Sequence, residues 1–149
     1  MPLPLPELGL VVQYGFIWAG EGRGTPPDAG KDRPCLIVDL IEVKEAALAD
    51  RPVFRVTYLP ISHTPPRAHE HAIVIPPRVA QHLGLTGQVS YLYTSYAVED
   101  DWPFDLALIP GTVGDFHYGF VPPRLFTAVT AEFARRLAAH PSFVHKTGG

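Results

Sequence analysis

The sequence predicts a mainly β domain with one helix at its C-terminal end. The 17 prolines and 13 glycines are spread along the 149 residues, so they divide the chain into segments too short for long helices. β-Branched and aromatic side chains gather in short runs, as strands require. A stripe of apolar residues at helical spacing follows near the end of the chain. Five to seven strands and a terminal helix favour a small, strongly bent antiparallel sheet or a partly open barrel.

The first half of the chain predicts three strands. They are expected at residues 10–18, 34–42 and 53–59, where β-branched, aromatic or other apolar side chains are concentrated. Residues 19–32 hold four glycines, two prolines and no apolar residue larger than alanine, so they should form a long exposed loop, a kind that is often functional. The strands on either side of residues 44–52 are expected to pair as a hairpin.

The second half begins with another irregular loop, predicted at residues 60–71, and a short strand at 72–75. A short helix should follow, because Pro76 and Pro77 suit its first positions and Gly84 suits a left-handed C-terminal cap. Further extended segments are expected at residues 89–96, 106–109 and 116–121.

The terminal helix has the clearest pattern. Two prolines at 122 and 123 can begin it, and apolar residues then recur at spacings of three, four and four. This is the stripe of an amphipathic helix that packs on a core. The stripe consists of Phe126, Val129, Phe133 and Leu137.

Length and composition fit a single domain over residues 1–149. A chain of this size encloses one core, and 46% hydrophobic with 18% charged residues is an ordinary globular balance. We expect the core at about residues 9–139, with a flexible proline-rich N-terminal arm and a flexible C-terminal tail. The single cysteine, Cys35, excludes a disulfide framework within the chain and fits a reducing compartment.

Charge and hydropathy narrow the class of protein. A net charge of −3 and a pI of about 6.1 lack the basic excess of most nucleic-acid-binding domains, so any RNA contact should be local. The N-terminus lacks the basic and continuous apolar regions of a secretory signal. No apolar run approaches the ~20 residues that a membrane-spanning helix needs. We therefore expect a cytoplasmic protein.

Arg33 stands at the entrance of a predicted interior strand, in the motif K-D-R-P, and the next strand ends in L-P-I-S-H-T. These motifs, in order after an aromatic strand and a long glycine-containing loop and before a terminal helix, resemble the PemK/MazF-like toxin family. Members of that family carry H-R-P or R-R-P before an apolar strand, and V-P-x-T or V-P-x-S at the end of the next strand. The resemblance covers roughly residues 10–137.

The resemblance implies a small SH3-like, partly open barrel (the CcdB/MazF-like toxin fold) that forms a homodimer. It also implies an endoribonuclease that cleaves single-stranded RNA without a metal or other cofactor, held inactive by an antitoxin in a type II toxin–antitoxin system. The arginine of the family falls on Arg33, and its hydroxyl residue falls on Ser62. Further substrate contacts are expected from Trp18, Arg23, Lys31 and Thr64.

The residue types suit this chemistry. Attack of a ribose 2′-OH on the neighbouring phosphorus builds charge on the nonbridging oxygens, and a planar guanidinium such as that of Arg33 can contact two of them. One preorganised donor contributes ~3 kcal/mol at the transition state, and Ser62 would add a second donor. We infer from the residue itself, and not from the resemblance, that His63 accepts the 2′-OH proton, because histidine titrates near neutral pH.

Ordinary structural roles stay open for the same three residues. Arg33 could form a surface ion pair with Asp32 or Asp28, worth less than about 1 kcal/mol. Ser62 could close the end of its strand in a serine turn. His63 could be an exposed loop residue without a function.

A cluster of His63, His69, Glu70 and His71 also raises the possibility of a metal site. If residues 69–71 are extended, the two histidines among them point the same way and the glutamate points to the opposite side. That arrangement offers two ligands readily, and no cysteine pair or H-E-x-x-H helix adds to them. The sequence therefore favours a solvated strand entrance over a metal site.

Residues 97–105 hold four acidic side chains and no basic one. They form either a patch for a basic antitoxin segment, anchored by Trp102 and Phe104, or an acidic turn whose aromatic side chains cap the barrel. A different class of function is open as well: a non-catalytic binding module with the toxin fold that holds a protein or nucleic-acid partner without cleaving it.

Overall fold

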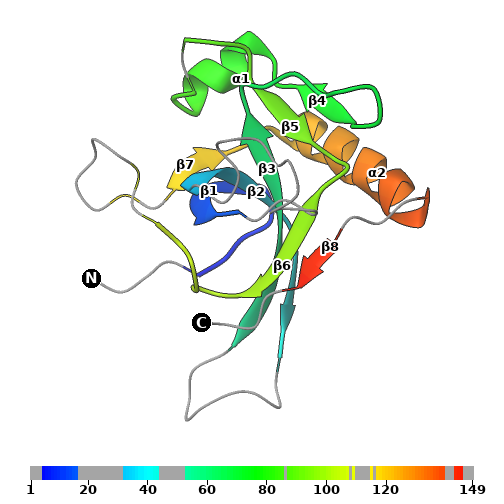
Figure 1. Cartoon of the computed structure of the whole chain (residues 1–149). Helices are drawn as coiled ribbons and strands as arrows, with labels where there is room; N and C mark the ends of the chain where they lie inside the picture. The colour runs from blue at the N-terminus through cyan, green and yellow to red at the C-terminus, as the bar shows by residue number, and fades with distance from the viewer. Residues whose placement is uncertain are drawn as a thin grey trace.

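A bent, mainly antiparallel sheet with one long helix beside it makes up most of the fold (Figure 1). The computed structural model describes residues 5–16, 32–43, 53–85, 87–107, 109, 115, 117–139 and 143–145. The elements in chain order are β1 (Leu10–Gly15), β2 (Asp32–Glu42), β3 (Phe54–Ser62), β4 (Ala72–Val74), α1 (Pro77–His82), β5 (Tyr91–Tyr93), β6 (Ala97–Asp101), β7 (His117–Phe120), α2 (Pro123–Ala139) and β8 (Phe143–His145).

Strand β3 occupies the centre of the sheet. The strands follow the order β4-β5-β3-β2-β1-β7, and β6 pairs with β3 outside this path. β2 and β3 pair antiparallel, which confirms the predicted hairpin. The other edge of β3 is shared, because residues 55–58 pair with β6 and residues 61–62 pair with β5. The fold is therefore mainly β with a C-terminal helix, as predicted, and it is compatible with a partly open barrel.

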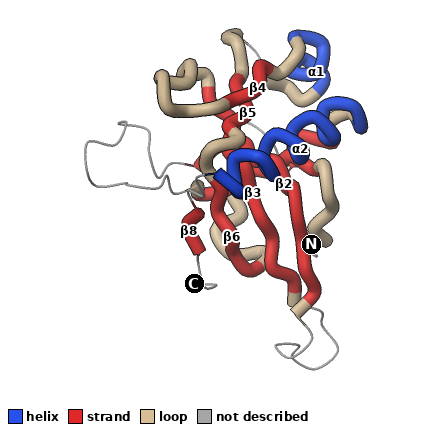
Figure 2. The backbone as a smooth tube through the Cα atoms, turned by 90° about the vertical axis from the view of Figure 1, so that its right-hand side faces the viewer, coloured by secondary structure: helices blue, strands red, loops and turns tan. Residues whose placement is uncertain are grey.

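The two faces of the sheet belong to two buried clusters, because side chains alternate along each strand. On one face, Leu36 of β2 and Leu59 of β3 pack in a cluster that includes Val129 of α2. Figure 2 shows α2 lying across the sheet on this side. On the other face, Ile37 and Tyr58 belong to the second cluster. All five side chains are fully buried.

The predicted stripe of α2 is confirmed at three of its four positions. Val129 is buried, and Phe126 and Phe133 pack against the same cluster. The prediction is wrong for Leu137, which is 37% exposed, because the buried cluster does not extend to the last turn of the helix. No helix in the described part of the chain combines the length and apolarity that crossing a bilayer requires.

Several local predictions are also confirmed. β1, β2, β4 and β7 fall within or beside the predicted segments. α1 begins at Pro77, and Gly84 has a φ of 74°, the left-handed conformation expected of a capping glycine. Of the segment predicted at 106–109, Leu106 forms a single bridge with Tyr14.

Two predicted boundaries are wrong because distant pairing decides them. Residues 60–62 were expected to open a loop, but they belong to β3, since Ile61 and Ser62 pair with β5. The strand predicted at residues 89–96 is shorter: β5 covers three of these residues, and the break before β6 lies where β3 exchanges one partner strand for the other.

The predicted acidic turn is wrong for residues 97–101, which form β6. Their charges are matched across the sheet: Arg55 of β3 binds Glu99 at 2.9 Å and Asp101 at 2.7 Å. Trp102 is buried in the core, whereas Phe104 is 45% exposed. The acidic residues of the strand therefore serve sheet pairing, which a reading of composition alone missed.

A short strand, β8, lies within the segment predicted to be the C-terminal tail. β8 pairs in parallel with β6 over residues 97–99. Backbone hydrogen bonding to an available sheet edge explains this better than side-chain pattern, because the strand is only three residues long.

A buried hydrogen bond connects β1 to β6 on the face opposite α2. The hydroxyl of Tyr14 donates to Oδ2 of Asp100 at 2.7 Å, and both residues are almost fully buried. The ring of Tyr14 stacks on Tyr58, with ring centroids 4.0 Å apart. Burial, followed by the bond to Asp100, raises the pKa of Tyr14 far above its ordinary value.

Replacing Tyr14 by Phe should lower the free energy of unfolding by about 1.5–3 kcal/mol, the usual cost of losing a hydrogen bond to a charged group. Tyr118→Phe is the matched control, because that hydroxyl donates to the neutral amide oxygen of Gln13 at 2.6 Å. Urea denaturation at neutral pH measures both variants. If Tyr14→Phe lowered the free energy of unfolding no more than Tyr118→Phe does, the hydrogen bond to Asp100 would not be the stronger of the two.

Candidate functional site

Two prolines mark the point where β2 and β3 part. Their ladder ends at the pair Cys35 and Pro60, and the next residue of β2 is Pro34. A proline has no N–H, so neither ring can donate a bond that would extend the ladder. Beyond this point β2 continues beside β1, and β3 continues beside β5. Moving away from the ladder, Arg33 is the residue next to Pro34 on β2, and Ser62 lies two residues beyond Pro60 on β3.

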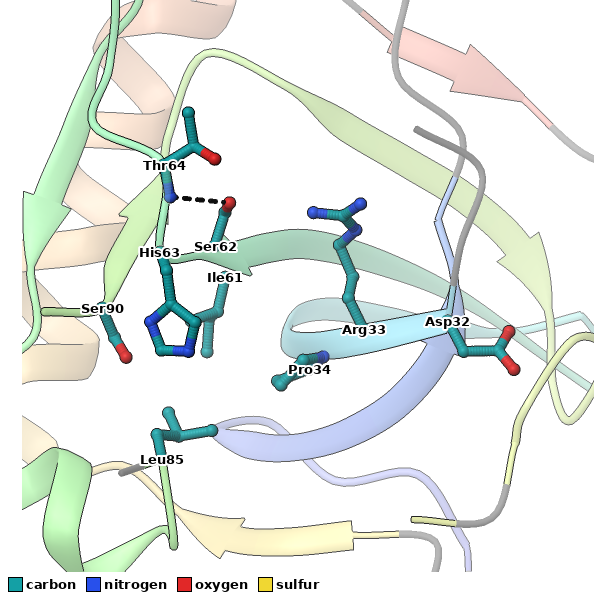
Figure 3. Close-up of a pocket in the computed structure, with 9 residues that line it drawn as sticks. All are labelled: Asp32, Arg33, Pro34, Ile61, Ser62, His63, Thr64, Leu85 and Ser90. Atoms are coloured by element: carbon teal, nitrogen blue, oxygen red, sulfur yellow. Dashed lines mark hydrogen bonds between the residues drawn. The ribbon is translucent and has the colours of Figure 1, made fainter. Parts of the chain in front are cut away.

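A pocket of about 250 Å³ opens at this parting (Figure 3). Its walls come from the ends of β2 and β3, from the loop after β3, and from the segment between α1 and β5. The residues that line it are Asp32, Arg33, Pro34, Ile61, Ser62, His63, Thr64, Leu85 and Ser90. Four of the predicted site residues therefore line the same pocket: Arg33, Ser62, His63 and Thr64.

The side chains that line the pocket divide between two sides. Figure 3 shows the guanidinium of Arg33 and the hydroxyl of Ser62 directed to one side, and the ring of His63 directed to the other. The strand explains the division, because consecutive side chains such as those of Ser62 and His63 alternate. We call the first the Arg33 side and the second, where Ser90 and Leu85 lie, the Ser90 side. The structure therefore brings together only two of the three predicted catalytic groups.

Arg33 is held in a restricted position. The residue is 7% exposed, and it pairs with Tyr14 of β1 in the sheet. The alternative of a surface ion pair with Asp32 is not favoured, because Figure 3 shows the two side chains pointing apart. The other partner considered for it, Asp28, lies outside the described residues. Burial by packing limits the directions in which the guanidinium can point, which is what a preorganised donor requires.

Ser62 forms the serine turn that the sequence left open. Its Oγ accepts a hydrogen bond from the backbone N–H of Thr64 at 3.1 Å. The hydroxyl of Tyr93 donates to the carbonyl oxygen of Thr64 at 2.6 Å and fixes the same turn to β5. A serine hydroxyl has one proton to donate besides its acceptor lone pairs, so Ser62 can close this turn and also donate to a ligand.

His63 is exposed, and its orientation is set by one hydrogen bond. Nδ1 lies 3.1 Å from the carbonyl oxygen of Val89. A carbonyl can only accept, so Nδ1 carries the proton, and in the neutral ring Nε2 keeps a lone pair. The ring lies between Ser90 and Ile61 in Figure 3. It can accept a hydrogen bond on the Ser90 side of the pocket.

Ser90 is the residue that sequence reasoning missed. It is 1% exposed, yet its hydroxyl has no hydrogen-bond partner among the residues that the structure describes. Figure 3 shows this hydroxyl directed toward the space beside His63 and Leu85. Alternation along the predicted strand could have identified it, because Ser90 shares a parity with Leu92, a fully buried residue.

The loop after Ser62 is fastened by Glu70, whose side chain is only 7% exposed. It accepts hydrogen bonds from the hydroxyl of Tyr96 at 2.6 Å and from the backbone N–H of Arg67 at 2.8 Å. Burial alone would raise the pKa of Glu70, but these bonds and the Arg67 charge outweigh it and hold the pKa below its ordinary value. Burial and the same contact raise the pKa of Tyr96 to about 12.

The histidines of this loop take separate positions. His69 and His71 do not lie in a strand, because β4 begins only at Ala72, so the alternation considered for a metal site does not apply to them. His71 Nε2 lies 3.2 Å from Nη1 of Arg136, which must be the donor. Within the described ranges, no three His, Cys, Asp or Glu side chains gather as a metal-binding group. Glu70 is engaged by the loop itself, as described above.

Three predicted substrate contacts, Trp18, Arg23 and Lys31, lie outside the described residues, as does most of the loop predicted at residues 19–32. Comparisons of the whole chain with family models, curated proteins and solved structures found no match. The resemblance to PemK/MazF-like toxins therefore stays a prediction from the motifs.

Glu70→Gln should destabilise the protein at neutral pH by about 1–3 kcal/mol, because the amide accepts these hydrogen bonds less strongly than a carboxylate. The pKa of Glu70 is lowered by folding, so its stabilising effect is present above the unfolded pKa of about 4.3 and is lost as pH falls through the lower folded value. The difference from wild type should therefore shrink as the pH falls below about 4.3.

Urea denaturation across this pH range measures the effect, with Glu42→Gln at the exposed end of β2 as the matched control. A Glu70→Gln effect that is the same at neutral and acidic pH would show that the carboxylate charge is not what fastens the loop.

Proposed function

We propose that this chain is a toxin-type endoribonuclease that cleaves single-stranded RNA without a metal ion. The observation that carries the proposal is the presence of Arg33 and Ser62 on one side of a pocket where β2 and β3 part. A guanidinium and a hydroxyl both donate hydrogen bonds, and a phosphodiester offers two nonbridging acceptor oxygens. The resemblance of K-D-R-P and L-P-I-S-H-T to the toxin motifs supports the same assignment.

In the proposed reaction, the 2′-oxygen of one ribose attacks the adjacent phosphorus, and the bond from phosphorus to the 5′-oxygen of the next nucleotide breaks. The products are a 2′,3′-cyclic phosphate and a 5′-hydroxyl, and the proton leaves the 2′-oxygen and is returned through solvent to the 5′-oxygen. Arg33 and Ser62 stabilise the charge that develops on the nonbridging oxygens. The burial of Arg33 strengthens this interaction, because the local dielectric is lower than in water.

The orientation of His63 changes its part in the reaction. Its ring lies on the Ser90 side, across the pocket from the groups that would hold the phosphate. We therefore assign proton removal to solvent and assign His63 to contact with the substrate through Nε2. The proposal also includes, through the resemblance, a homodimer and a partner antitoxin of a type II toxin–antitoxin system.

One observation favours the alternative of a binding module without catalysis. Among the described residues that line the pocket, Asp32 and His63 carry the carboxylate and the imidazole that could serve as a base, and both point away from the guanidinium of Arg33. A pocket of this kind can bind a phosphate without promoting its cleavage. Such a protein would hold RNA, or an anionic segment of a protein, at Arg33.

The test is incubation of the purified chain with a long single-stranded RNA in the presence of a chelator, with mapping of the new ends. Wild type should give discrete fragments with 2′,3′-cyclic phosphates. Arg33→Ala should lower the rate by about 100-fold or more, the usual effect of removing a transition-state donor. His63→Gln should lower it by less than about tenfold, because the ring faces away from Arg33.

Arg124→Ala, an exposed position on α2, is the matched control for the loss of one positive charge. Circular dichroism and thermal melting establish that each variant is folded. Intact RNA with folded wild-type protein would reject the ribonuclease. Retention of RNA binding that Arg33→Ala abolishes would then establish the binding module.

A further inference from the structure

A second pocket, of about 660 Å³, adjoins the first beside α1. The two pockets share Leu85 and Ser90 in their walls. The remaining lining residues of the second pocket are Val74, Ile75, Pro77, Ala80, Gln81, Gly87, Gln88 and Val89. The two pockets are therefore neighbours that meet at Leu85 and Ser90.

The lining of the second pocket selects against a charged ligand. None of the described residues that form it carries a charged side chain. Apolar side chains dominate, and two of them at the rim, Val74 and Val89, are more than half exposed. Gln81 and Gln88 are exposed amides that can both donate and accept hydrogen bonds. Apolar walls with a few neutral polar groups suit a flat, uncharged ring that has hydrogen-bonding edges.

Ser90 supplies an observation that points independently to a ligand. A buried hydroxyl without a partner costs free energy, so such groups are rare unless something else satisfies them. The backbone fixes this residue, because its carbonyl oxygen accepts a bond from the N–H of Ile75 at 2.9 Å. Leu85 is fixed as well, since its N–H donates to the carbonyl oxygen of Ala80 at 2.8 Å. The backbone between the two pockets is thus held in place, while the hydroxyl of Ser90 has no hydrogen-bond partner among the described residues.

We infer that the second pocket binds a nucleobase of the RNA strand whose phosphate lies at Arg33. The inference rests on the proposed function for its choice of ligand. The base stacks against Leu85 and Ile75, and the hydroxyl of Ser90 bonds to its edge. The exposed amides of Gln81 and Gln88 read the other edge. These groups would make the pocket a determinant of which nucleotide is accepted next to the cleaved bond.

The experiment uses free nucleosides, which have no phosphate and so do not depend on Arg33. Isotope-labelled protein is titrated to millimolar concentrations with adenosine, guanosine, cytidine and uridine in turn, and backbone amide resonances are followed. At least one nucleoside should shift the resonances of Leu85, Gln88 and Ser90. Ser90→Ala should weaken the binding of that nucleoside by about tenfold, the typical effect of losing one buried hydrogen bond.

Two controls make the result specific. Ser90→Ala should not lower the melting temperature, because the hydroxyl has no partner in the described chain to lose. Arg33→Ala should bind the nucleoside as wild type does. Nucleoside binding without RNA cleavage would support the base pocket and reject the ribonuclease. RNA cleavage without nucleoside binding would support the ribonuclease and reject the base pocket. If only an apolar peptide, and no nucleoside, shifted these resonances, the inference would be overturned and the second pocket would be assigned to a protein partner.

Discussion

The rest of the site depends on the two prolines at which β2 and β3 stop pairing. Pro34 and Pro60 cannot donate to a ladder, so the central hairpin opens at its end and each strand takes a new neighbour. Had the pairing continued, Arg33 would lie opposite Ser62 in a closed sheet, with no space between their strands. The opening leaves a pocket at the end of a hairpin that is otherwise rigidly packed on both faces.

The alternation of side chains along the strands then determines which chemical groups face each side of the pocket. Arg33 and Ser62 share one side, where two donors suit an anion, and His63 and Ser90 share the other, which adjoins the apolar second pocket. A phosphodiester with its base has this same division, since the charge and the flat ring are on different parts of one nucleotide. The two proposals therefore describe neighbouring parts of a single ligand. The loop that carries Thr64 is fastened by Tyr93 and, further along, by Glu70.

The sequence predicted those features that depend on local pattern. Proline and glycine positions located α1 with its Gly84 cap, and apolar runs located β1, β2 and most of β3. Features that depend on distant pairing were missed: β6 lies in a segment that composition marks as acidic loop, and β8 is too short to have a pattern of its own. The same limit affected the site. Residues 60–62 were treated as loop, so alternation was not applied to Ser62 and His63. Alternation was not applied to the predicted strand at residues 89–96 either, so Ser90 was missed.

The central claim is that Arg33, at the parting of the strands, meets a phosphate of single-stranded RNA. The most direct test is nuclear magnetic resonance of the arginine side-chain Nε–Hε groups during titration with an oligonucleotide in which 2′-deoxy sugars prevent cleavage. The account predicts that the Arg33 signal shifts as the oligonucleotide binds, while those of Arg55, paired within the sheet, and Arg124, exposed on α2, do not. Saturable binding that leaves the Arg33 signal unchanged would contradict it.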